Sequence, residues 1–474
     1  MRHHPRPLAP RQHVFILCHF SVAARDPIKA EFAITMQQCD TLIRARWCIP
    51  VEPADVVLED HAVAVTDGRI VGILPMQDAQ ARFNPGVLIE RPDHVLIPGL
   101  INAHTHAAMT LFRGLAEDMP LERWLREGVW PREQRWVSAE MVRDGTKHAI
   151  VEMLRGGITC FSDQYFFPEV AAESAIDLHM RAMIGTPVLD FPTPWAEDID
   201  DYLTKATDLV HDPYADHPLI SSCFAPHSTS ALSDESAQKL RVLADQLDRR
   251  VQIHLHETAA EIAITVQETG KRPLARLSDL GFVNTSLLAV HAVQMTDAEL
   301  QQFVVAGVSV AHCPRSNLKL ASGIAPVKAM LDSGINVALG TDGAASNNEL
   351  DILGEMRSAA LLAKVKSEDA AAISASTALR MATLNGAIAL GLSETVGSIE
   401  TGKWADLTCV DLNHINSQPV YDPTVQLVYS CHKEQVSDVW VAGRHQLDNG
   451  SFTQVNEVEI LQRSAEWQAR IASE

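Results

Sequence analysis

The sequence lacks paired cysteines. Its cysteines stand singly, and no two of them form a Cys-x-x-Cys pair (Cys18, Cys39, Cys48, Cys160, Cys223, Cys313, Cys409 and Cys431). Scattered single cysteines argue against a disulfide framework and indicate a reducing compartment. We therefore expect a cytoplasmic protein.

The sequence also lacks a long apolar run and an excess of basic residues. No run reaches the ~18 apolar residues that a bilayer-spanning helix needs. The chain carries 39 Lys and Arg against 60 Asp and Glu, a formal net charge of −21. Because this charge repels nucleic acid and anionic membranes, we expect neither of them as a partner.

Residues 1–36 show no clear pattern. Arg6 and Arg11 precede a short apolar run at 14–17, which hints at a signal peptide. His19 interrupts that run early, whereas the apolar core of a signal peptide spans about 7–15 residues. We interpret residues 1–36 as a disordered extension.

The two ends of the remaining chain share a β-like pattern. Short apolar runs at 41–43, 62–65 and 69–74 include the hairpin turn Asp67-Gly68, and similar runs return at 407–410 and 439–443. These runs predict a small β-sandwich built from both ends of the chain, residues 37–96 and 398–455. A C-terminal helix is expected over residues 456–474.

The middle of the chain, residues 97–397, alternates apolar runs with helical stretches. Eight runs can be counted, at 95–101, 158–161, 180–184, 219–224, 251–255, 287–290, 308–311 and 335–339. Eight strand-then-helix units predict an α/β protein with a (β/α)8 barrel, and a length of 474 residues suits such a barrel plus a smaller domain. The chemistry of such barrels lies at the C-terminal ends of the strands.

Metal-type side chains fall at those ends. His104 and His106 follow the first run, and side chains two residues apart share one face of a strand. Two neutral imidazoles this close suit a borderline cation such as zinc. The pair alone would fit an ordinary polar strand end, but His254, His291 and Asp342 recur at the ends of later runs.

Three imidazoles and one carboxylate leave a coordination position open for water, as a catalytic metal site requires. We expect His104, His106, His254 and Asp342 to be the ligands, with Asp342 also receiving a proton from the water. Glu257, three residues beyond His254, is a candidate proton shuttle.

Three histidines leave alternatives open. His256 shares a strand face with His254 and could replace it as a ligand. His291 could be a ligand, although we favour a role in orienting the water or the substrate. His312 is expected to be structural.

The residues around these histidines resemble the amidohydrolase superfamily. The closer match is its chlorohydrolase/deaminase branch, which includes the 5′-methylthioadenosine/S-adenosylhomocysteine deaminases. The resemblance covers residues 37–455, and its motifs are more specific for the branch than for the substrate. The matching segments are 98–106 (PGLINAHTH), 109–114 (MTLFRG), 130–133 (WPRE), 225–228 (APHS), 254–258 (HLHET) and 340–348 (GTDGAASNN).

The resemblance implies roles for individual residues. One metal, zinc with Fe²⁺ or Mn²⁺ as alternatives, is implied at the four ligands. The site is expected to be mononuclear, because residues 224–227 contain no lysine where binuclear relatives carry one. Glu257 is implied to protonate the purine ring, and His291 to orient the attacking water. Glu133 and His227 are implied to bind the ribose hydroxyls, and Ser346 to lie beside the substrate pocket.

The expected function is zinc-dependent hydrolytic deamination of an adenine nucleoside. Residues 185–188 (GTPV) offer no arginine for the amino-acid tail of S-adenosylhomocysteine, so the resemblance favours methylthioadenosine or adenosine. One alternative is hydrolysis of another heteroaromatic ring, such as guanine, 8-oxoguanine, cytosine or a triazine. A second is a non-catalytic barrel scaffold. We expect a homodimer or homotetramer, and a lid over residues 120–130 with Trp130 packed inside.

Overall fold

The computed structural model describes residues 36–473, and residues Met36–Glu474 belong to one compact unit. Apart from Met36, the extension expected over residues 1–36 lies outside the described residues. No helix within the described part is long and apolar enough to cross a membrane.

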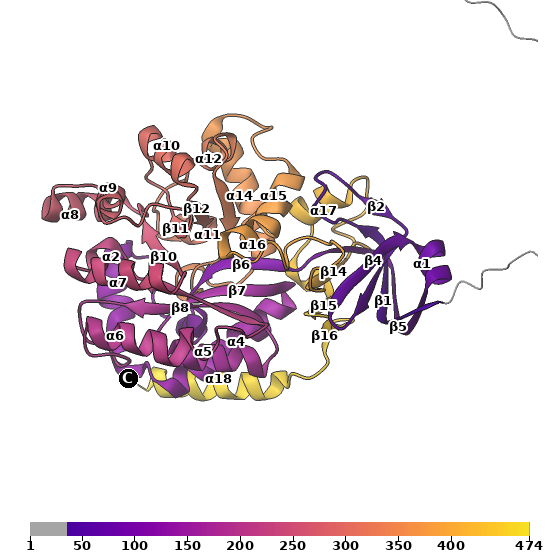
Figure 1. Cartoon of the computed structure of the whole chain (residues 1–474), viewed down its shortest axis with the longest axis horizontal. Helices are drawn as coiled ribbons and strands as arrows, with labels where there is room; N and C mark the ends of the chain where they lie inside the picture. The colour runs from indigo at the N-terminus through magenta and orange to yellow at the C-terminus, as the bar shows by residue number, and fades with distance from the viewer. Residues whose placement is uncertain (1–35, 474) are drawn as a thin grey trace, which may run out of the picture. The chain divides into compact units, whose positions relative to one another are not determined.

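One sheet joins the two ends of the chain. Its strands follow the order β17-β16-β15-β14-β5-β1-β3-β4, with β2 paired to β1. Figure 1 shows the indigo N-terminal strands beside the golden C-terminal ones, and β14 pairs antiparallel with β5. The prediction that both ends build one β-rich region is confirmed. The strands are β1 (Gln37–Cys48), β2 (Leu58–Glu59), β3 (His61–Thr66), β4 (Arg69–Pro75), β5 (Phe83–Pro98), β14 (Leu407–Asp411), β15 (Val436–Val441), β16 (Arg444–Asp448) and β17 (Ser451–Phe452).

The predicted hairpin turn connects β3 and β4. Asp67 and Gly68 both have positive φ angles, 49° and 73°, as a two-residue turn of type I′ requires. A Cβ atom on Gly68 would lie 2.4 Å from the carbonyl oxygen of Ala442, so the position requires glycine.

The second sheet is the predicted (β/α)8 barrel. Eight strands follow the order β13-β12-β11-β10-β9-β8-β7-β6, and all their pairings are parallel. The strands are β6 (Leu100–Thr105), β7 (Ile158–Gln164), β8 (Arg181–Val188), β9 (Ile220–Pro226), β10 (Arg250–Leu255), β11 (Leu287–His291), β12 (Ser309–His312) and β13 (Asn336–Leu339).

Most helices lie around the barrel strands, whereas α1 lies beside the terminal sheet between β4 and β5. They are α1 (Met76–Arg82), α2 (Leu121–Arg123), α3 (Trp130–Trp136), α4 (Ala139–Arg155), α5 (Pro168–Asp177), α6 (Ile199–Ala206), α7 (Asp234–Gln246), α8 (Ala259–Thr269), α9 (Pro273–Asp279), α10 (Asp297–Ala306), α11 (Pro314–Lys319), α12 (Val327–Asp332), α13 (Ala344–Asn347), α14 (Ile352–Ser367), α15 (Ala375–Met381), α16 (Leu384–Leu390), α17 (Pro423–Tyr429) and α18 (Glu457–Ala472). The C-terminal helix α18 packs against α4, where Trp467 Nε1 donates to Asp144 Oδ2 over 2.8 Å (Figure 1).

The first predicted barrel strand, residues 95–101, is wrong in its bounds. β5 ends at Pro98 in the first sheet, and β6 begins at Leu100 in the barrel. Gly99 lies between them, and a Cβ atom there would lie 2.0 Å from Thr159 Oγ1. The apolar run is continuous because both strands are buried, although they belong to different sheets.

Side chains and backbone close the barrel between its last and first strands. The Asp342 N–H donates to the His104 carbonyl over 3.0 Å, and the Thr341 N–H donates to Asn102 Oδ1 over 2.9 Å. Asn102 Nδ2 in turn donates to Thr341 Oγ1 over 2.7 Å. These bonds hold Asp342 beside the histidines that end β6.

In the segment expected to form a lid, residues 120–130, the burial of the tryptophans differs from the prediction. Trp124 is buried and its Nε1 donates to the Ala116 carbonyl over 3.1 Å. Trp130, predicted to pack inside, is 48% exposed. Trp124 and Val129 take the inward positions of this segment, which leaves Trp130 on the outer side.

Candidate metal centre

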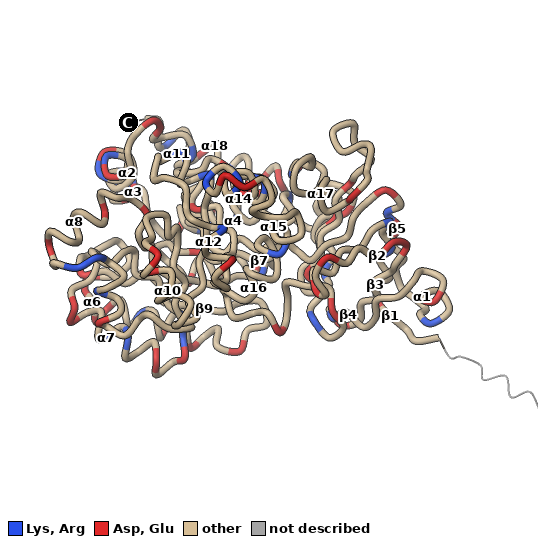
Figure 2. The backbone as a smooth tube through the Cα atoms, turned by 90° about the horizontal axis from the view of Figure 1, so that it is seen from above, with Lys and Arg blue, Asp and Glu red and all other residues tan. Residues whose placement is uncertain are grey.

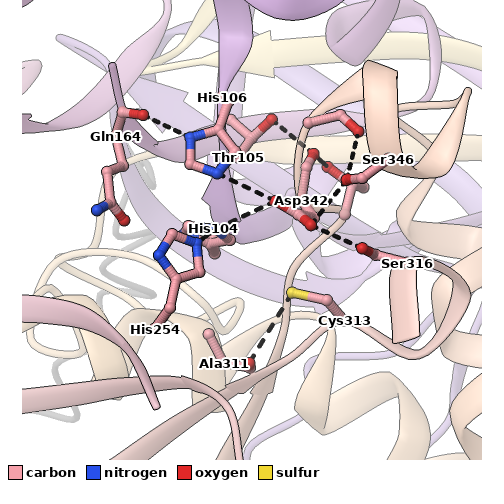
Figure 3. A network of polar contacts seen from close by, with 12 residues as sticks. His104, Thr105, His106, Gln164, His254, Ala311, Cys313, Ser316, Asp342 and Ser346 are labelled. Atoms are coloured by element: carbon pink, nitrogen blue, oxygen red, sulfur yellow. Dashed lines mark hydrogen bonds and ion pairs between the residues drawn. The ribbon is translucent and has the colours of Figure 1, made fainter. Parts of the chain in front are cut away.

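Four metal-type side chains meet at the C-terminal ends of the barrel strands. One ligand atom each from His104, His254, His291 and Asp342 lies within 4.8 Å of the others. His104 Nε2 is 3.2 Å from His254 Nε2 and 3.4 Å from Asp342 Oδ1 (Figure 3). All four residues are buried, so their lone pairs converge away from bulk water.

His106 approaches the same carboxylate. It lies outside the group of four, but its Nε2 is 3.2 Å from Asp342 Oδ1. Its Nδ1 contacts the Gln164 carbonyl at 2.5 Å, and His254 Nδ1 contacts the His227 carbonyl at 2.6 Å. Because these carbonyls accept the Nδ1 protons, each Nε2 is left as an acceptor that faces the centre, as in metal-binding histidines.

The charges at the centre fit a divalent cation. Burial raises the pKa of Asp342, but the imidazoles of His104 and His106 outweigh it and hold this pKa well below its usual range. Burial lowers the pKa of His106, whereas Asp342 raises it, with a net value of about 9. A zinc ion would stabilise the carboxylate in the same way while leaving the imidazoles neutral.

The choice between His254 and His256 is decided by the backbone. β10 ends at Leu255, and His256 has a φ of 54°, so the two histidines do not continue the alternation of a strand. His256 Nε2 accepts from the Leu274 N–H over 3.2 Å, and its Nδ1 lies 3.7 Å from Glu299. The His256 ring therefore faces away from the cluster.

Glu257 and His291 form a pair beside the centre. Glu257 Oε2 lies 3.8 Å from His291 Nε2, and Glu257 Oε1 accepts from Ser322 Oγ over 3.3 Å. Burial raises the pKa of Glu257, which favours its protonated form. His291 Nδ1 contacts Asn317 Oδ1 at 2.8 Å, so its Nε2 is the acceptor.

The two residues implied at the ribose lie near the histidines. Glu133 Oε1 accepts from the Tyr165 hydroxyl over 2.8 Å, and the Tyr165 ring lies 6.4 Å from that of His106. Burial raises the pKa of Glu133. The His227 ring lies 4.7 Å from that of His254 and is exposed. The sequence analysis did not identify Tyr165, which follows directly after β7.

Ser346, which the resemblance implies beside the substrate pocket, contacts Asp342. Its hydroxyl donates to Asp342 Oδ2 over 2.7 Å, and the residue is buried. Ser316 donates to the same oxygen over 2.6 Å and was missed by the sequence analysis, as were Asn317 and Ser322. These three follow His312, which is buried. Burial lowers the pKa of His312 to about 3. The signal available for Ser316 and Asn317 was the run 312–317 (HCPRSN), whose polar residues follow directly on the seventh barrel strand.

A separate cavity of about 590 Å³ lies beside α8. Ile262 and Val266 line it together with Gln294, Met295 and Lys366. None of the clustered histidines lines it, so the candidate site is located by its chemistry rather than by the size of this hollow.

Comparison with known proteins agrees with this geometry. The sequence profile of the amidohydrolase family matches residues 95–445, which include the whole barrel. The chain belongs to the amidohydrolase family. The prediction made from the motifs around His104 is therefore confirmed.

Relatives of this amidohydrolase match it over nearly their full length. A Teredinibacter turnerae protein named 5-methylthioadenosine/S-adenosylhomocysteine deaminase is 44% identical over 434 residues, which are 92% of this chain and 98% of that protein. The crystal structure of an adenosine deaminase from Xanthomonas campestris with bound zinc has 49% identity and a TM-score of 0.92, covering 93% and 100% of the two chains. An atrazine chlorohydrolase from Arthrobacter aurescens, complexed with zinc, has 25% identity and a TM-score of 0.83, covering 90% and 99%.

The geometry of the cluster and the family together identify the kind of site. In this amidohydrolase the side chains of His104, His254, His291 and Asp342 converge on a site that suits a divalent metal.

Proposed function

We propose that this amidohydrolase removes the 6-amino group of an adenine nucleoside by hydrolysis, releasing ammonia and a 6-oxo purine nucleoside. The observation that carries the proposal is the buried carboxyl of Glu257, 3.8 Å from His291 at the edge of the metal centre. A carboxyl whose pKa is raised by burial is protonated more readily and can then donate to a ring nitrogen. Relatives named as deaminases support the same reaction.

We propose one zinc ion per chain, held by His104, His106, His254 and Asp342, with Fe²⁺ or Mn²⁺ as alternatives. When bound there, zinc would lower the pKa of a water molecule toward ~7 and so make hydroxide available at neutral pH. His291 is proposed as a positioning group rather than a ligand, because its Nε2 faces Glu257 as well as the cluster.

The protein side chains then move the protons. His291 Nε2 accepts a hydrogen bond from the attacking water and directs it to C6 of the purine. Asp342 takes a proton from this water, while Glu257 donates its proton to N1. As the C6–N bond breaks, Asp342 passes its proton to the departing amine, which leaves as ammonia. The new hydroxyl then loses its remaining proton, which returns to Glu257, and the ring keeps the oxygen as a 6-oxo group.

The remaining residues are proposed to determine the substrate. Glu133 and His227 bind the ribose hydroxyls, so a nucleoside is preferred over a free base. The end of β8 contains no arginine at residues 185–188. We therefore propose that methylthioadenosine and adenosine are better substrates than S-adenosylhomocysteine, whose charged tail lacks a partner there.

A substrate panel tests the proposal. Ammonia release is measured with zinc-loaded protein on adenosine, methylthioadenosine, S-adenosylhomocysteine, guanine and cytosine. Methylthioadenosine or adenosine should have the highest kcat/KM. A higher value for guanine or cytosine would assign the site to another heteroaromatic ring, and no release from any substrate at full zinc content would support a scaffold.

We also propose that the enzyme acts in the cytoplasm as a homodimer or homotetramer. All seven cysteines of the described part are free and buried, which suits a reducing compartment. Figure 2 shows positions of both charge signs over the barrel helices and the terminal sheet. Light scattering measures the subunit number.

The proposed domains are a barrel over residues 97–397 and a β-region over 37–96 and 398–455, followed by a C-terminal helix within 456–474.

A further inference from the structure

The segment that follows β12 contacts three polar groups of the proposed reaction. α11 and the turn after it contain Ser316, Asn317 and Ser322. Ser316 contacts Asp342, Asn317 contacts His291, and Ser322 contacts Glu257. This one short segment therefore contacts Asp342, His291 and Glu257, which lie at the ends of three other barrel strands.

Ser316 holds one oxygen of Asp342. Its Oγ donates to Oδ2 over 2.6 Å, and Ser346 Oγ donates to the same atom over 2.7 Å (Figure 3). With both hydroxyls on Oδ2, the other oxygen, Oδ1, faces His104 and His106. Removal of a hydroxyl would let the carboxylate rotate and weaken its lone-pair alignment with the metal.

Asn317 holds the ring of His291. Its Oδ1 lies 2.8 Å from His291 Nδ1, and both residues are buried. The Asn317 Nδ2 has no hydrogen-bond partner within residues 36–473. A neutral imidazole has one N–H, so its bond to Asn317 leaves Nε2 as the acceptor.

The segment is itself held in place. The Ser322 N–H donates to the Asn317 carbonyl over 2.8 Å, which closes the turn after α11. Lys319 Nζ donates to the Ala345 carbonyl over 3.2 Å and pairs with Glu117 Oε2 at 2.8 Å. These contacts tie α11 both to α13 and to the segment that follows β6.

We propose that Ser316 and Asn317 are positioning residues, Ser316 for Asp342 and Asn317 for His291. The kinetic part of this inference rests on the proposed function. The parts that concern zinc affinity and the His291 tautomer do not.

Two variants remove the contacts, and two others control for the loss of a buried polar group. Ser316→Ala is compared with Ser174→Ala, whose hydroxyl contacts only the Val170 carbonyl of its own helix. Asn317→Leu is compared with Asn385→Leu, whose side-chain amide donates to the Val337 carbonyl of β13 over 3.0 Å. Thermal unfolding confirms that each variant is folded.

Zinc affinity tests Ser316 without any substrate. By competition with a chromogenic chelator, Ser316→Ala should raise the zinc Kd about 10- to 100-fold, the usual effect of losing a support of a metal ligand. Ser174→Ala should change it less than about threefold. An unchanged Kd in Ser316→Ala would overturn the role of Ser316. If Ser316→Ala does not fold, Ser316→Cys retains the volume and a weaker donor, and the same comparison applies.

Kinetics and the tautomer test Asn317. Asn317→Leu should lower kcat about 10- to 100-fold with little change in KM, and the ¹⁵N NMR signals of His291 should lose the Nδ1–H form in zinc-loaded protein. Asn317→Asp keeps an oxygen acceptor and should restore that form. An unchanged His291 tautomer in Asn317→Leu would overturn the role of Asn317. If wild-type protein released no ammonia, the proposed function would be wrong, whereas the Kd and NMR results would still decide this inference.

Discussion

Replacing Glu133 by alanine tests the proposed ribose contact. Tyr165 connects the Glu133 carboxylate to the metal centre. Its hydroxyl donates to Glu133 Oε1 over 2.8 Å, and its ring lies 6.4 Å from that of His106. A carboxylate offers about four lone-pair sites, and Tyr165 uses one of them. Room therefore remains on the carboxylate to accept from a ribose hydroxyl.

The expected loss follows from the strength of a charge-assisted hydrogen bond. One such bond contributes about 1.5–3 kcal/mol. At about 1.4 kcal/mol for each factor of ten, the loss in kcat/KM on a nucleoside is roughly 10- to 150-fold. A free base has no ribose, so its kcat/KM should change less than about threefold.

The assay compares kcat/KM on methylthioadenosine and on adenine for wild type and Glu133→Ala. Tyr165→Phe is the matched variant, because it keeps the carboxylate but removes its internal donor, and it should weaken nucleoside turnover less. The alternative is that Glu133 only pairs with a surface arginine such as Arg132 or Arg135. A drop below about threefold on methylthioadenosine, or an equal drop on adenine, would rule out the ribose contact.

Three further predictions concern the metal centre and the terminal sheet. Glu257→Gln should keep its zinc but lower kcat about 10²- to 10⁴-fold, since an amide cannot donate the proton; near-native turnover at full zinc content would contradict the shuttle role. His106→Ala should lower zinc content below one equivalent, and His291→Ala should keep zinc but lose turnover; metal analysis showing the reverse would exchange their roles. Asp438→Asn should destabilise the protein by about 1.5–3 kcal/mol at pH 7, because it removes the buried carboxylate that Arg91 Nε contacts over 2.7 Å and leaves Arg91 paired with the exposed Asp448. Burial opposes the ionisation of Asp438, but hydrogen bonds hold its pKa well below the ordinary ~3.9. The contribution of Asp438 to the free energy of unfolding is therefore full above pH ~3.9 and is lost as the pH falls below this value. Urea unfolding at pH 7 and pH 3 should therefore show a smaller difference in stability between wild type and Asp438→Asn at pH 3. An equal difference at both pH values would refute the depressed pKa of Asp438.

The barrel could be read from the sequence because its strands are buried on both faces. Such strands appear as short continuous apolar runs, and the run 287–290 corresponds to β11 (Leu287–His291). Because the strands on either side of Gly99 are both buried, the boundary between β5 and β6 could not be recognised in the sequence. An apolar run does not reveal which sheet buries it, so β5 and β6 were predicted as one strand.

The site was predicted as far as residue type and strand end allow. His104 and His254 lie near the C-terminal ends of their strands and Asp342 lies just beyond β13, and the topology of a parallel barrel brings such ends together. The exclusion of His256 needed its positive φ, which no alternation pattern contains. The bond from the Ser346 hydroxyl to Asp342 could not be predicted from the sequence, because it depends on how the chain turns after β13.

The sequence by itself determined the barrel, the family and the kinds of side chain at the centre, since apolar periodicity and motif spacing are local properties of the chain. Tertiary structure alone decided which atom each side chain faces. Ser316 and Asp342 are 26 residues apart, and so are His291 and Asn317. Hydrogen bonds between such distant residues depend on angles and distances that arise only when all eight strands are packed, because each bond is short and directional.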